Sequence, residues 1–184
     1  GIGDALIRSA SALSAAGNTM EQSIALITAM NSTVQDTDKV GTTLKTLTMY
    51  LRAAKTEAES AGEATDGMAS SVSKLREDIL SLTNNKVDIM LDSENFKSTY
   101  HIMQEISDVW NDIADVDQAN LLELLGGKRN SDAVVSLIKN FQTAKDVMDG
   151  LGQSAGSADR ELATFKDSIE GRMTDLRTSF QKLS

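Results

Sequence analysis

A Gly-Gly-Lys run at residues 126–128 is the first part of this sequence that could do chemistry, because glycine loops followed by lysine can cradle a phosphate group. A nucleotide-binding phosphate loop also needs a glycine six residues ahead of the lysine, a Ser or Thr directly after it, and a buried strand leading in. Here those two positions hold Leu122 and Arg129, and the lead-in NLLELL has the spacing of a helix. The run therefore fails all three requirements of a phosphate loop.

The same run is typical of a joint between two helices. Gly126 and Gly127 are the residue type that most readily ends a helix in the left-handed conformation. Asn130 or Ser131 then has the kind of side chain that caps the start of the next helix. We therefore predict a structural role for the two glycines.

The remaining chemical candidates are one histidine and a row of carboxylates. His101 lies one step from two apolar stripes, which predicts a partly buried structural imidazole without the partners that a base or metal ligand needs. The carboxylates are those of Glu105, Asp108, Asp112, Asp115 and Asp117. They lie in line along a helix and its exit and do not face one another across a cleft, so they indicate a solvated surface. We predict no catalytic residue, no cofactor and no metal site.

Composition limits the classes of protein to consider. The chain has 184 residues, a formal net charge of −9, and neither Cys nor Pro. It can fold as one domain, and without Cys it has no disulfide or thiolate metal site. Lys and Arg are scattered among an excess of acids, which argues against general nucleic-acid binding, and no apolar run is long enough to span a bilayer. Because the first residue is not Met, we expect a segment of a longer protein.

The first part of the chain predicts a helical hairpin followed by a long helix. The first helix of the hairpin ends at Gly17, and Thr19 with Gln22 has the spacing of a capping box that starts the second. The long helix is expected over residues 38–60, where apolar residues alternate at spacings of four and three. Its apolar stripe, which would pack in the core or against a partner, consists of Val40, Leu44, Leu47, Leu51, Ala54 and Ala58.

The middle of the chain predicts a linker, a helix and an extended segment. Residues 62–67 read as a polar linker, and the apolar spacing over residues 72–82 predicts a helix that ends at the Asn pair 84–85. Alternating apolar residues at 87–91 then favour a short extended segment.

The second half predicts further helices. Residues 96–113 are apolar on two sides, which favours a central helix with Trp110 as its largest anchor. One helix runs up to the glycine pair, another covers residues 134–149, and the last covers residues 157–184. The stripe of that last helix includes Leu162, Phe165, Ile169, Met173, Leu176, Phe180 and Leu183.

Together these patterns predict an all-α, compact bundle of seven to eight helices, with a short extended segment at 87–91. Residues 1–66 would form the hairpin and the long helix, and residues 67–184 would continue the same domain. The stripe of the last helix continues to the final residues, so we expect that helix to extend into a longer rod or to pack against another copy.

Three runs of sequence also carry a resemblance to a known family. They are residues 9–57, residues 88–141 (which include LLELLGGKRN) and residues 167–180 (DSIEGRMTDLRTSF). In this order the chain resembles the tail tape measure proteins of long-tailed bacteriophages and prophages of Gram-positive bacteria. Such proteins are usually much longer, so the resemblance implies an internal segment.

The resemblance implies a scaffold in the virion tail, assembled in the cytoplasm of the host bacterium. It implies a helical protein that is threaded through the tail tube, sets tail length and leaves ahead of the DNA. The implied partners are the tail tube protein and the tail assembly chaperones. Extended as one helix, the chain would reach roughly 280 Å. Its glycine breaks instead favour helices that fold back into a compact module within the tape measure protein.

Two other functions stay open. One is a helical oligomerisation module that uses the stripes at 40–58 and 162–183 to bind copies of itself or the tail tube protein. The other is a cell-wall-cleaving region, of which the zinc-dependent kind is excluded because the chain has a single histidine. Membrane contact is a family property that these acidic helices do not favour.

Overall fold

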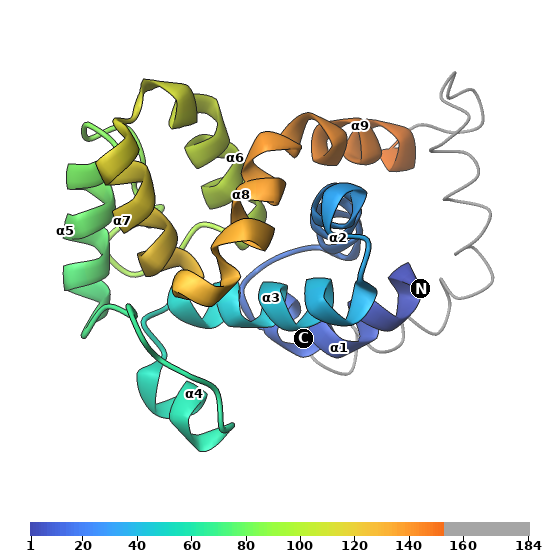
Figure 1. The fold of residues 1–184 in the computed structure, drawn as a ribbon, viewed down its shortest axis with the longest axis horizontal. Helices are drawn as coiled ribbons and strands as arrows, with labels where there is room; N and C mark the ends of the chain where they lie inside the picture. Colours follow the sequence, from blue (N-terminus) through green and yellow to red (C-terminus); the bar gives the residue numbers. More distant parts are fainter. Residues whose placement is uncertain (153–184) are drawn as a thin grey trace.

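A computed structural model describes residues 1–152 of the chain, and this part is all-α, as the sequence predicts (Figure 1). The α-helices are α1 (Ile2–Ala15), α2 (Met20–Val34), α3 (Thr37–Tyr50), α4 (Lys55–Ser60), α5 (Val72–Leu82), α6 (Thr99–Val109), α7 (Asp115–Gly126), α8 (Ser131–Lys139) and α9 (Phe141–Gly152). Two 3₁₀ turns, Trp110–Asp112 and Lys128–Asn130, lead into α7 and α8. The last predicted helix, at 157–184 and including Phe165, Ile169 and Phe180, lies outside the described residues.

The helices form a bundle around one main core. Helix α1 packs along α3, and α2 lies between these two helices and α9 (Figure 1). Helices α5 and α7 pack together at the other side, and α6 and α8 lie beside each other between that pair and helices α2 and α9. Helix α4 projects at the bottom of the view. No helix within residues 1–152 is both long and apolar enough to cross a membrane.

Helix α2 is enclosed by other helices, because it packs against α1, α3, α8 and α9. Its capping box is confirmed: the Gln22 backbone N–H donates to Thr19 Oγ1 at 3.1 Å, and the Thr19 N–H donates to Gln22 Oε1 at 2.9 Å. Six apolar side chains of α2 are 0% exposed, namely Ile24, Ala25, Leu26, Ile27, Ala29 and Met30. The predicted central helix, 96–113, has instead an exposed side that carries His101 and Asp108.

The predicted long helix at 38–60 is wrong, because the chain breaks between α3 and α4. The Ala54 N–H donates to the Met49 carbonyl at 3.1 Å and the Ala53 N–H to the Tyr50 carbonyl at 3.1 Å, which is the hydrogen-bond pattern of a Schellman motif. Ala53 has φ +48°, in the left-handed region where such motifs usually place glycine. Turning here lets Ala58 of α4 pack against Tyr50 and Met68 in a small second cluster.

The boundaries of two later helices also differ from the prediction. Helix α6 starts at Thr99 and not near Phe96, because Phe96 pairs with Met90 in an isolated antiparallel bridge and Ser98 caps the helix. That bridge lies where the extended segment at 87–91 is expected. The predicted helix at 134–149 is two helices that meet at Asn140.

Candidate interaction site

The first four residues of the predicted apolar stripe lie inside the main core, whereas Ala54 is only partly buried and Ala58 packs in the second cluster. Val40, Leu44 and Leu47 are 0% exposed and Leu51 is 1% exposed, all in contact with the main cluster. Trp110, which the sequence predicts as an anchor, is also buried there. These side chains hold the bundle together and do not present a surface to another molecule.

The two predicted joint glycines lie between α7 and α8. Gly127 adopts φ +80° and ψ 162°, and a Cβ atom there would lie 3.1 Å from the Asp66 carbonyl and 3.2 Å from the Tyr50 hydroxyl. Asn130 precedes α8, but its side-chain amide donates to the Gly126 carbonyl at 2.7 Å. The asparagine therefore provides a hydrogen-bond donor for a carbonyl at the end of α7, and its side chain does not cap the start of α8.

The chemical candidates do not form a reactive arrangement in the described part of the chain. His101 is exposed, with Nδ1 3.0 Å from Ser98 Oγ, so the prediction of partial burial is wrong. Glu105 accepts two hydrogen bonds of 2.9 Å from Lys97, and Asp108 pairs with Lys145 at 3.3 Å. Within residues 1–152, no three His, Cys, Asp or Glu side chains gather in a way that could hold a metal ion.

A groove of about 470 Å³ lies on the surface between α1 and α3, and we name it the α1–α3 groove. It is lined by Arg8, Ser11, Ala12, Ala15, Ala16, Lys45, Thr48, Met49, Arg52, Ala54 and Glu57. The two helices come close at Gly41, where a Cβ atom would lie 3.1 Å from the Ala5 carbonyl. Further along, small alanines on α1 fill less of the space between the helices, and this leaves the groove.

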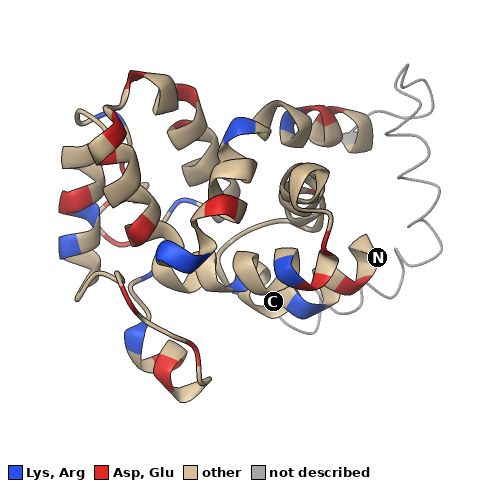
Figure 2. Ribbon diagram, in the orientation of Figure 1, with Lys and Arg blue, Asp and Glu red and all other residues tan. Residues whose placement is uncertain are grey.

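The rim of the α1–α3 groove carries three basic side chains. One lining side chain, Glu57, is acidic, and Lys45 lies 4.0 Å from the carboxylate of Glu63. Arg8 pairs with Asp38 at 2.9 Å, but both side chains are more than half exposed, so the pair is open to solvent and to competing anions. In Figure 2, both basic and acidic residues lie on α1 and α3 at the bottom, and acidic residues mark the turn between α6 and α7 at the top.

Arg52 lies at the end of the groove where α3 stops. Its guanidinium carbon stacks 4.2 Å from the centre of the Phe96 ring, which fixes the side chain against the bundle. Burial lowers the pKa of Arg52, although the group stays charged at neutral pH. The positive charge is thus held in a defined place beside the alanine floor.

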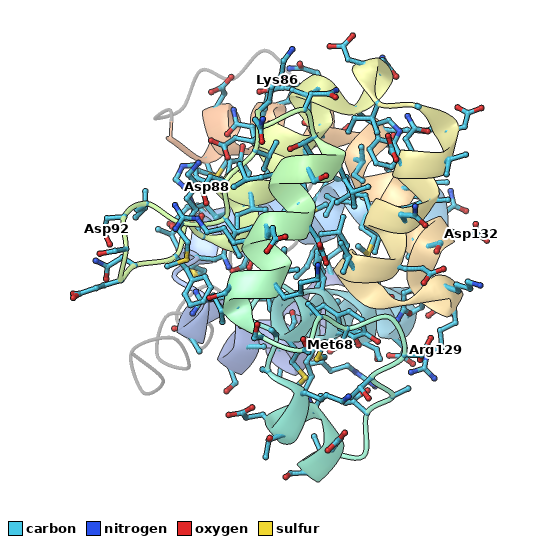
Figure 3. The ribbon with its side chains drawn as sticks, turned by 90° about the vertical axis from the view of Figure 1, so that its left-hand side faces the viewer. Met68, Lys86, Asp88, Asp92, Arg129 and Asp132 are labelled. Carbon is cyan, nitrogen blue, oxygen red and sulfur yellow. The ribbon has the colours of Figure 1, made fainter. Side chains whose placement is uncertain are left out.

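Tyr50 is a structural residue that the sequence did not single out. Its hydroxyl donates to the Asp66 carbonyl at 2.8 Å, which ties the linker after α4 to the end of α3. Burial, and then the charge of Asp66, raises the pKa of Tyr50. Met68 packs beside it, between α4 and the rest of the bundle (Figure 3). No local pattern could reveal this contact, since its partner lies 16 residues away in an irregular loop.

Comparison of the chain with protein-family models, with curated proteins and with solved structures gives no match.

Proposed function

We propose that this chain is an internal segment of a phage tail tape measure protein, in which it forms a compact helical module. The support for the family is the resemblance of residues 9–57, 88–141 and 167–180. In this proposal the segment adds length to the tail ruler, contacts the tail tube protein and the tail assembly chaperones, and resides in the virion tail after assembly in the host cytoplasm.

The observation that carries the proposal is the way buried hydroxyl groups bond in this bundle. Ser9, Thr46, Thr48 and Thr83 are all buried, and each hydroxyl donates to a carbonyl four residues earlier, at 2.7 to 3.2 Å. The first three lie within helices, and Thr83 directly follows α5, to whose Ile79 carbonyl it donates. Separating the helices would leave these hydrogen bonds intact. Contacts between helices therefore depend mainly on apolar burial, together with bonds such as that from the Tyr100 N–H to Asn18. The bundle can open into a chain of helices without breaking the bonds of these four hydroxyl groups.

Such opening is what a folded module needs if it is to fit inside a narrow tube. The breaks between α3 and α4, at Gly127 and at Asn140 are natural points for the helices to swing apart. Once extended as helix, residues 1–152 would span about 230 Å.

The test is an in-frame deletion of residues 1–152 in the phage or prophage that encodes them, followed by electron microscopy of the tails. We expect tails shorter by up to about 230 Å. The matched control replaces the same residues with an unrelated helical sequence of equal length, which should restore the tail length. Tails of unchanged length after the deletion would overturn the proposal.

A further inference from the structure

The α1–α3 groove has two properties that define what could bind it. Its floor is made of alanine side chains with Met49 at one side, so it suits a small apolar side chain. Its rim carries Arg8, Lys45 and Arg52, with Glu57 as the acidic lining residue. Arg8 pairs with Asp38 at 2.9 Å and Lys45 lies 4.0 Å from Glu63, and both pairs are partly exposed, so an acidic partner can compete for the two cations. A fitting partner would therefore present one apolar group surrounded by acids.

A surface of that kind lies on the same chain, at the turn that leads from α6 into α7. We name it the acidic ridge and define it as Asp112, Asp115, Val116 and Asp117. Val116 is 73% exposed, the largest exposed fraction among the large apolar side chains of residues 1–152. Within the same residues, none of the three ridge carboxylates has a hydrogen-bond or ion-pair partner, unlike Asp108 beside them.

The groove and the ridge lie at opposite edges of the molecule. Figure 1 shows the turn between α6 and α7 at the top, and α1, α3 and α4 at the bottom. The two surfaces of one copy therefore cannot meet each other. They can meet only between copies, in a head-to-tail contact.

We propose that a second copy of this chain docks its acidic ridge in the α1–α3 groove, with Val116 on the alanine floor and the ridge carboxylates facing Arg8, Lys45 and Arg52. This inference does not depend on a role in phage tails. Each copy has one groove and one ridge, so the contact repeats along a line of copies. Because it rests on one small apolar anchor and several exposed charges, the association is weak and sensitive to salt.

The experiment measures the mass of the full chain by light scattering across a concentration series in low salt. We expect the weight-average mass of the wild type to rise above the 19.7 kDa of one copy. The groove variant is Arg8→Gln/Lys45→Gln, and the ridge variant is Asp112→Asn/Asp115→Asn/Val116→Ser. Each should weaken association by at least about tenfold, while far-UV circular dichroism shows an unchanged helix content.

Two further samples decide whether the contact is the proposed one. A mixture of the groove variant and the ridge variant still contains one intact groove and one intact ridge, so it should form 1:1 pairs and nothing larger. The control variant Glu77→Gln/Glu94→Gln removes two exposed carboxylates elsewhere and should associate like the wild type.

Three results would overturn the proposal. The first is a wild type that stays at the mass of one copy at every concentration. The second is association of both variants as strong as that of the wild type, which would place the contact on another surface. The third is a mixture of the two variants that behaves as the sum of its parts.

Discussion

The side chain of Asn18 joins the end of α1 to the start of α6, through a hydrogen bond of 2.9 Å from the Tyr100 backbone N–H to Asn18 Oδ1. The two residues are 82 positions apart in sequence. The other half of the amide donates to the Leu13 carbonyl at 3.0 Å, and Asn18 is only 5% exposed. One buried amide thus satisfies backbone groups of two helix ends and fixes where α6 begins relative to α1.

Asn18→Ala should therefore lower the free energy of unfolding by about 2 kcal/mol, because it leaves the buried Tyr100 N–H without a partner. Urea denaturation followed by circular dichroism measures the change. The matched control is Asn140→Ala, which removes a long-range side-chain hydrogen bond to Thr33 that is exposed to solvent. Asn140→Ala should lower the free energy of unfolding by less than about 0.5 kcal/mol. Equal losses of stability in the two variants would show that burial of the Asn18 hydrogen bonds does not add to their contribution.

The adjacent glycines at the joint between α7 and α8 should respond in opposite directions to alanine. Gly127→Ala should lower the free energy of unfolding by at least about 2 kcal/mol, because φ +80° strains any L side chain and the new Cβ meets the Asp66 carbonyl at 3.1 Å. At Gly126 the backbone is helical and the nearest side-chain atom would be 3.4 Å away. Gly126→Ala should therefore be neutral or stabilise by about 0.5 kcal/mol.

Thermal unfolding of the two variants side by side measures the difference. If Gly127→Ala were as stable as the wild type, the left-handed conformation and the close approach of residue 66 would both be wrong.

Local signals allowed the sequence to predict several boundaries of the helices. The capping box of Thr19 and the Asn pair 84–85, both of whose members have positive φ, lie within one turn of the helix ends that they define. The break between α3 and α4, after Tyr50, has no such local signal, since no glycine lies there. Hydrogen bonds from the Tyr50 hydroxyl to the carbonyls of residues 64 and 66 help to hold this break, and these partners are distant in sequence. Similarly, the break at Asn140 coincides with a bond to Thr33 on α2.

The candidate site was less predictable than the helices. The α1–α3 groove depends on Ala12, Ala15 and Ala16 at the end of α1 and on Lys45 and Arg52, which lie 29 to 40 positions later in the sequence. Apolar periodicity identifies residues that become buried, and all of the predicted stripe except Ala54 is buried. It does not identify a surface that forms where small side chains leave space between two helices.

Ala53 offers a way to stabilise the joint between α3 and α4. The residue has φ +48° at the position where a Schellman motif favours glycine. Ala53→Gly should raise the free energy of unfolding by about 0.5 to 1 kcal/mol, because relief of the left-handed strain exceeds the added chain entropy of glycine. The control is Ala61→Gly at the end of α4, where φ is −84° and glycine should destabilise. Chemical denaturation would measure both, and a loss of stability in Ala53→Gly would contradict the assigned conformation.

The ion pair of Arg76 and Asp88 should make stability depend on pH. The Arg76 side chain donates two hydrogen bonds to the Asp88 carboxylate, at 2.9 and 2.7 Å, and links α5 to the segment before α6. These bonds hold the pKa of the Asp88 carboxyl below its ordinary value. Figure 3 shows Asp88 close to α5, with Asp92 further out at the tip of the same loop.

Because the pKa of Asp88 is lower in the folded chain than in the unfolded one, the pair stabilises the fold above an unfolded pKa of about 3.9. That stabilisation is lost as the pH falls through the lower pKa of the folded state. Asp88→Asn should therefore be less stable than the wild type at pH 7, and the difference should shrink below about pH 4. Urea denaturation at several pH values measures this difference, with Glu94→Gln as the control for loss of one exposed negative charge from the same loop. A difference between wild type and Asp88→Asn that stays constant from pH 7 to pH 3 would show that the carboxylate charge does not contribute.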